Sequence, residues 1–182
     1  MKFYILETDA SYTNCPRIKK WFGRIDHRDL NLHDAHKIPY RQLFMIHESE
    51  TTVFTSIVDK PFPLVSAEVK EVFDMYEPYI PYKEIILLDQ KFQRMEVYYL
   101  PILEEVDCLH EKSEYNLDRS LIKKGIIDYK KTEEKAVFRL KGFDHYYMVG
   151  RLDLVESILK RNVRGIGLKE LEVWEEERYE SE

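Results

Sequence analysis

Residues 106–115, VDCLHEKSEY, bring several reactive side-chain types together directly after a strongly apolar run. Cys108 and His110 are two residues apart, so on a strand both would point to the same face. Such a pair could form a nucleophile, because a neighbouring imidazole lowers the pKa of a thiol. Val106 and Leu109 suit the end of a strand, where Cys108 is a small buried apolar group. The pattern favours this packing interpretation.

A second group of polar residues lies nearer the N-terminus, where four histidines fall between residues 27 and 47. His33 and His36 are three apart, which would place both imidazoles on one face of a helix, and Asp29 could complete a metal shell. That set would serve a metal-dependent hydrolase. No H-E-x-x-H or C-x-x-C motif accompanies it, which favours a solvated polar loop. We therefore predict no metal and no cofactor.

Other catalytic motifs are absent from the sequence. No G-x-S-x-G, G-x-x-x-x-G-K or G-x-G-x-x-G occurs. Carboxylate pairs such as Glu104 and Glu105 carry little information in a chain with 34 acidic residues, and adjacent strand positions point to opposite faces. The residues therefore predict a protein that is not an enzyme.

The composition indicates a folded chain with an acidic balance. Hydrophobic residues make up 44% of the 182 positions and aromatic residues 13%, so we expect a single domain over residues 1–182. The formal net charge is −6, and residues 175–182 form an acidic tail with five glutamates and one arginine. Nucleic acid is disfavoured as a ligand, because its phosphates bind clustered Lys and Arg, whereas a basic protein would be attracted.

The cellular location is predicted from what the chain lacks. The two cysteines lie far apart in sequence, and no stretch is long and apolar enough for a signal peptide or a membrane span. We predict a cytoplasmic protein with reduced thiols and no membrane partner.

Strand-like patterns dominate the chain. Runs rich in branched and aromatic residues indicate strands at residues 2–7, 43–48, 52–58, 83–89, 94–103, 136–142, 145–150 and 166–174. We expect the second and third of these to pair through the polar residues 49–51. Residues 8–40 contain Pro, Gly and many polar residues, which predicts an irregular connection with short elements at best.

Two segments change to a helical period. Residues 67–77 and 151–162 each place apolar side chains at helical spacing, which predicts two amphipathic helices. Ser66 is expected to cap the first helix by accepting from its first turn. Strands outnumber helices and do not alternate strictly with them. We therefore predict an α+β fold with a mostly antiparallel sheet.

The stretch VYYLPILEEVDCLHEKSEY, followed by AVFRLKG, a YYMV strand, a helix and the ending GIGLKELEVW, resembles a known bacterial family. That family was first catalogued as of unknown function and later grouped with the immunity proteins encoded beside polymorphic toxins, the eleventh in the usual numbering. The resemblance covers residues 60–174 and the MKFYILE opening, and VDCLHEKSEY and FRLKG are its most specific parts. Gly150 departs from it, because the family usually has Ser there.

The resemblance implies a protein without catalytic residues that protects its producer by binding a cognate toxin. We accordingly hypothesise an α+β domain that blocks a basic toxin by occlusion. Loops on a sheet carry recognition more often than strands do, so we expect partner binding at Asp107, His110, Glu111, Glu114 and Tyr115. Two alternatives stay open: a hydrolase using Asp29, His33 and His36, and a general interaction module, including a homodimer formed through an edge strand.

Overall fold

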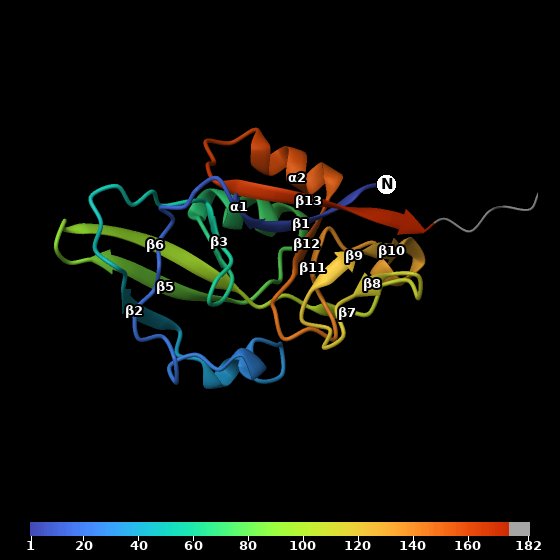
Figure 1. Ribbon diagram of the computed structural model, residues 1–182, viewed down its shortest axis with the longest axis horizontal. Coiled ribbons are helices and arrows are strands. Elements are labelled where there is room, and N and C mark those ends of the chain that lie inside the picture. The colour runs from blue at the N-terminus through green and yellow to red at the C-terminus, as the bar shows by residue number, and fades with distance from the viewer. Residues whose placement is uncertain (175–182) are drawn as a thin grey trace, which may run out of the picture.

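Two main sheets and two α-helices form the framework of the computed structural model, which describes residues 1–174 (Figure 1). The predicted acidic tail, residues 175–182, lies outside the described residues. The helices are α1 (Ala67–Tyr76) and α2 (Leu152–Leu159). The strands are β1 (Phe3–Thr8), β2 (Arg41–Met45), β3 (Ile57–Val58), β4 (Leu64–Val65), β5 (Tyr82–Asp89), β6 (Arg94–Pro101), β7 (Glu105–Val106), β8 (Glu114–Tyr115), β9 (Ile122–Lys124), β10 (Ile126–Asp128), β11 (Val137–Leu140), β12 (Met148–Arg151) and β13 (Ile166–Trp174).

The α+β prediction is confirmed. Most strand pairs are antiparallel, while β2–β5, β10–β13 and β7–β11 pair in parallel. Neither α-helix within residues 1–174 has the length and apolar character needed to cross a bilayer. The strands are distributed over two main sheets and a small two-stranded one.

The larger sheet has six strands in the order β10-β13-β1-β12-β11-β7. Its two outermost strands are joined by the chain that follows β7. Leu109 forms a bridge with Ile127 of β10, flanked by hydrogen bonds from Asp128 N to the Cys108 carbonyl (2.7 Å) and from His110 N to the Ile126 carbonyl (2.8 Å). Strand pairing therefore runs all the way round this sheet and closes it into a ring.

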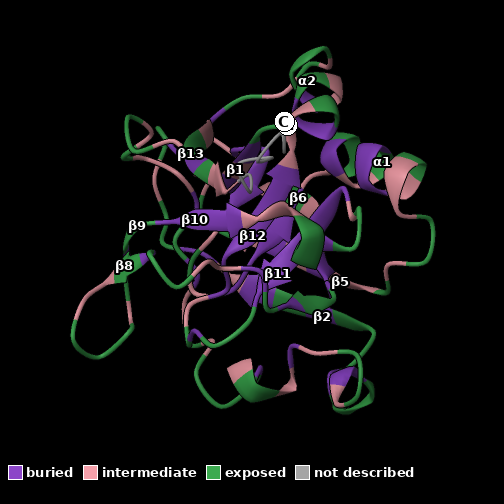
Figure 2. Ribbon diagram, turned by 90° about the vertical axis from the view of Figure 1, so that its right-hand side faces the viewer, coloured by how far each residue is buried: buried purple, intermediate pink, exposed green. Residues whose placement is uncertain are grey.

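Side chains on β1 alternate between two cores, as the two-residue period of a strand requires. Phe3 and Ile5 pack inside the closed sheet with Phe138, whereas Leu6 packs on the outer face. Leu154 of α2 belongs to that outer core. Figure 2 shows the buried residues concentrated in the strands at the centre and the exposed residues on the surrounding loops.

The smaller main sheet has the order β2-β5-β6-β4-β3. The predicted pairing of residues 43–48 with residues 52–58 is wrong, because β2 pairs in parallel with β5 and β3 pairs with β4. Only Ile57 and Val58 of the predicted third strand are regular. Polar side chains interrupt the rest: the Thr55 hydroxyl donates to the Ile57 carbonyl at 2.8 Å, which competes with ladder hydrogen bonds.

Both helices lie within their predicted ranges but are shorter. Ser66 occupies the N-cap position of α1, yet its side chain makes no capping hydrogen bond, so that expectation is wrong. Arg151 takes the same position on α2 and binds Asp153 through Nε at 2.8 Å. Beyond the end of α2, Arg161 donates from Nη1 to the Ser157 carbonyl at 2.7 Å, which suits the negative end of a helix.

Residues 9–40 connect the two sheets with two short 3-10 helices, His27–Asp29 and Ala35–Lys37. A third, Tyr129–Thr132, follows β10. The connection is held by buried apolar side chains and by Arg139 of β11, which donates to the Leu30 carbonyl at 2.9 Å. The long polar segment is thereby attached to the six-stranded sheet.

Candidate partner-binding surface

Four of the five predicted partner-binding residues line one hollow of about 290 Å³. We call it the loop hollow, and its lining is Asp107, Leu109, His110, Glu111, Tyr115, Arg119, Lys141, Gly142 and Phe143. The fifth predicted residue, Glu114, is exposed on β8 and lies outside this lining.

Pairing between β7 and β11 places two distant segments on the same hollow. Leu140 is opposite Val106, and Lys141 N donates to the Val106 carbonyl at 3.1 Å. The FRLKG stretch therefore ends beside VDCLHEKSEY, so that Lys141 and Gly142 line the same hollow as Asp107 and His110.

The polar turn of this segment is fixed from beneath by the buried Ser113. Its hydroxyl donates to the Ile126 carbonyl at 3.2 Å and accepts from the Ile126 amide at 3.0 Å. Ser113 N also donates to the His110 carbonyl at 2.9 Å. A turn held by three hydrogen bonds presents its outward side chains with little loss of conformational freedom on binding.

Aromatic rings form one wall of the loop hollow. The rings of Tyr115 and Phe143 lie 5.7 Å apart, and Phe143 contacts Tyr147 edge-on at 5.2 Å. The Arg119 guanidinium lies 4.9 Å from the Tyr115 ring centre. Rigid aromatic side chains beside charged groups are the typical anchors of protein interfaces.

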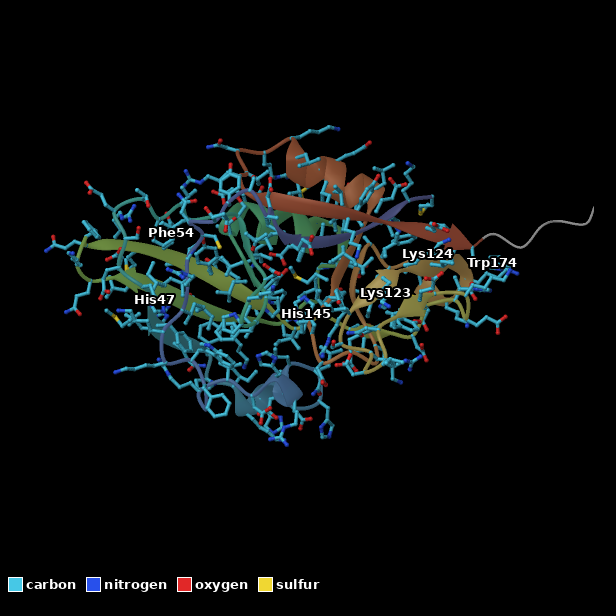
Figure 3. All side chains as sticks on the ribbon, viewed as in Figure 1. His47, Phe54, Lys123, Lys124, His145 and Trp174 are labelled. Atoms are coloured by element: carbon cyan, nitrogen blue, oxygen red, sulfur yellow. The ribbon has the colours of Figure 1, made fainter. Side chains whose placement is uncertain are left out.

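Trp174 extends this surface and was not among the residues predicted to bind a partner. Its ring stacks on His110 at 4.2 Å, and the Lys112 ammonium lies 4.2 Å from the Trp174 ring. Figure 3 shows Trp174 at the far end of the molecule from His47 and Phe54. The available signal was a large aromatic residue at the point where the last strand gives way to glutamates.

Several charged side chains here have no partner within residues 1–174. Asp107, Glu111 and Glu114 are exposed, and none of them forms a salt bridge with that part of the chain. Lys141 is likewise exposed without a salt bridge there. The surface can therefore pair with charged groups of a partner without first breaking internal ion pairs.

Cys108 is buried in the core of the closed sheet, with 0% of its surface exposed. Burial raises the pKa of its thiol to about 12. His110 makes other contacts, because its Nδ1 accepts from Lys112 N at 3.2 Å and its ring covers Trp174. The geometry agrees with the packing interpretation of Cys108, since a protonated buried thiol is a poor nucleophile.

Thiol labelling at pH 8 tests this placement. Iodoacetamide should modify Cys108 of the folded protein at least about tenfold more slowly than half-buried Cys15, because reaction needs an accessible thiolate. Peptide mass spectrometry over time gives both rates, and labelling in urea, where the two rates should converge, is the control. Rapid labelling of Cys108 in the folded state would contradict its burial.

The residues of the alternative hydrolase site, Asp29, His33 and His36, are not grouped as metal ligands. His33 is exposed and its Nδ1 lies 3.1 Å from Asp34, while His36 Nδ1 lies 2.9 Å from the His33 carbonyl. Asp29 pairs with Lys37 at 3.6 Å. Within residues 1–174, no three or more His, Cys, Asp or Glu side chains are grouped so that they could hold a metal ion.

No protein-family model matches the sequence, and no curated protein matches it. The family resemblance therefore stays a prediction.

Proposed function

We propose that the protein is a non-catalytic, immunity-type protein that binds a cognate toxin in the cytoplasm of its producer and blocks it by occlusion. The observation that carries the proposal is the meeting of VDCLHEKSEY and FRLKG at one hollow. These are the two stretches most specific to the immunity family in the resemblance. A shared recognition surface gives a reason for both to resemble that family.

The chemistry of the surface supports a protein partner. It combines two half-buried aromatic side chains, Tyr115 and Trp174, with carboxylates free to pair. Five glutamates and one arginine follow Trp174 in sequence, which adds negative charge to this end of the chain. Complementary charge would speed the encounter with a basic toxin domain.

The test uses the purified protein and the toxin domain encoded beside it. We expect co-elution of the two and loss of toxicity on co-expression. Reversing two exposed charges, Asp107→Lys with Glu111→Lys, should weaken binding about tenfold or more, because each new lysine repels a basic partner. Biolayer interferometry at several salt concentrations measures the affinity and the association rate.

The matched control is Glu156→Lys, an exposed glutamate on α2 outside the loop hollow. It should keep wild-type affinity and protection. Unchanged toxicity in the presence of the wild-type protein would count against the proposed function. Equal weakening by the control and the double variant would count against the loop hollow as the binding surface.

A further inference from the structure

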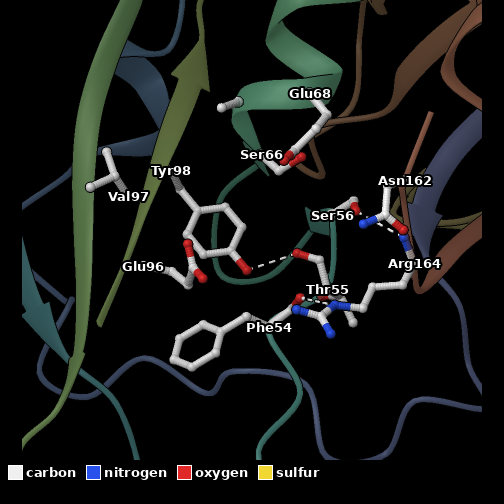
Figure 4. A pocket seen from close by; sticks show the side chains of 11 residues that line it. Phe54, Thr55, Ser56, Ser66, Glu68, Glu96, Val97, Tyr98, Asn162 and Arg164 are labelled. Carbon is white, nitrogen blue, oxygen red and sulfur yellow. Dashed lines mark hydrogen bonds between the residues drawn. The ribbon is translucent and has the colours of Figure 1, made fainter. Parts of the chain in front are cut away.

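A second, smaller pocket lies on different elements from the loop hollow. It has a volume of about 220 Å³ and is walled by the segment before β3, the start of α1, strand β6 and the turn after α2 (Figure 4). Its side walls include Phe54 and the ring of Tyr98. Small-molecule sites usually measure about 300–1,000 Å³, so this pocket suits one side chain better than a cofactor.

The walls of this pocket are hydrogen-bonded to one another. The Tyr98 hydroxyl donates to the Thr55 carbonyl at 2.7 Å, and Ser66 N donates to the Ser56 carbonyl at 2.8 Å. Arg164 is fixed twice, from N to the Ser56 hydroxyl at 2.9 Å and from Nε to the Phe54 carbonyl at 3.0 Å. The pocket is thus formed before any ligand arrives.

Two exposed carboxylates that line this pocket lack partners. Those of Glu68 and Glu96 form no salt bridge or hydrogen bond within residues 1–174. Burial raises the pKa of the Tyr98 hydroxyl, the charge of Glu96 raises it further, and the charge of Arg164 lowers it.

These groups select for a cation. Two carboxylates face a single guanidinium, that of Arg164, so the mouth of the pocket has an excess of negative charge. A planar guanidinium can donate to two carboxylates at once and stack on an aromatic face, which an ammonium does less well.

We propose that this pocket binds the guanidinium of an arginine side chain presented by a protein partner. Glu68 and Glu96 hold its charge, and the half-buried Phe54 ring lies against its plane. The loop hollow takes no part in this contact, and the test needs no toxin, so its outcome is separate from that of the proposed function.

The probe is the peptide Gly-Ser-Arg-Ser-Gly with blocked ends, titrated into the folded protein labelled with ¹⁵N. We expect saturable shifts of the Glu68, Tyr98 and Asn162 amides, with a dissociation constant on the order of 1 mM for a single side chain. Glu96→Gln should weaken binding about two- to fivefold, because it removes one exposed charge pair.

Two controls decide the chemistry. The same peptide with citrulline, which is neutral and of nearly the same shape, should not bind, and Glu156→Gln should bind like wild type. Equal binding of the citrulline peptide, an unchanged affinity in Glu96→Gln, or absence of shifts at the pocket would overturn the proposal. Tighter binding of agmatine than of the peptide would also overturn it, since the ligand would then be a free small molecule.

Discussion

Replacing Phe138 by alanine is expected to lower the free energy of unfolding by about 3–5 kcal/mol. Phe138 is fully buried at the centre of the closed sheet, where its ring meets Phe3 edge-on at 6.0 Å. Alanine would leave a cavity inside the closed sheet. The surrounding strands cannot move inward to fill it, because strand pairing runs all the way round the ring. Domains of this size are stable by only about 5–15 kcal/mol, so the loss is severe.

Urea denaturation followed by circular dichroism measures this change. Phe22→Ala is the matched control, because Phe22 is 87% exposed and should change stability by less than about 0.5 kcal/mol. A small effect of Phe138→Ala, similar to that of Phe22→Ala, would mean that the core of the closed sheet does not hold the fold together.

Arg139→Met is expected to cost about 2–3 kcal/mol and to release the connection between the sheets. The buried Arg139 guanidinium pairs with Glu105 at 3.2 Å and donates to the Leu30 carbonyl at 2.9 Å. Methionine fills much of the same volume but leaves the Leu30 carbonyl without its donor. The half-exposed Glu105 can turn to water, which keeps the cost below that of a fully buried ion pair.

Hydrogen exchange reports the local part of this effect. Amides of residues 27–38 should exchange faster in Arg139→Met than in wild type, while α1 and α2 change less. Arg41→Met removes the surface pair with Glu84 and should cost at most about 1 kcal/mol. Equal losses of stability in Arg139→Met and Arg41→Met would mean that the Arg139–Glu105 pair contributes no more than an ordinary surface ion pair.

Sequence patterns predict an element correctly where the residues that determine it are neighbours in the sequence. The final strand, residues 166–174, was predicted with correct bounds because its apolar positions recur along one continuous run. The closed ring could not be predicted, since β7 has only 2 residues and β10 only 3, too few for a pattern. The false pairing of residues 43–48 with 52–58 has a related cause: nearness in sequence favours a hairpin, whereas β2 pairs with distant β5.

The same distinction holds for the candidate surface. Asp107, His110, Glu111 and Tyr115 are contiguous in sequence after a strand, so their gathering could be foreseen. Arg119, Lys141, Phe143 and Trp174 come from other segments, and only the strand order brings them together. The pocket beside Tyr98 is lined by residues from four separate segments, and no sequence motif indicates it.

The position of β1 in the larger sheet sets a constraint on biosynthesis. β1 lies between β12 and β13, whose first residues are Met148 and Ile166. A ribosome adds about 5–20 residues per second. On the order of ten seconds or more therefore pass between the synthesis of β1 and the synthesis of either neighbouring strand. During that interval its apolar residues Phe3, Ile5 and Leu6 have no strand to pair with, and a nascent-chain chaperone would find a binding segment there.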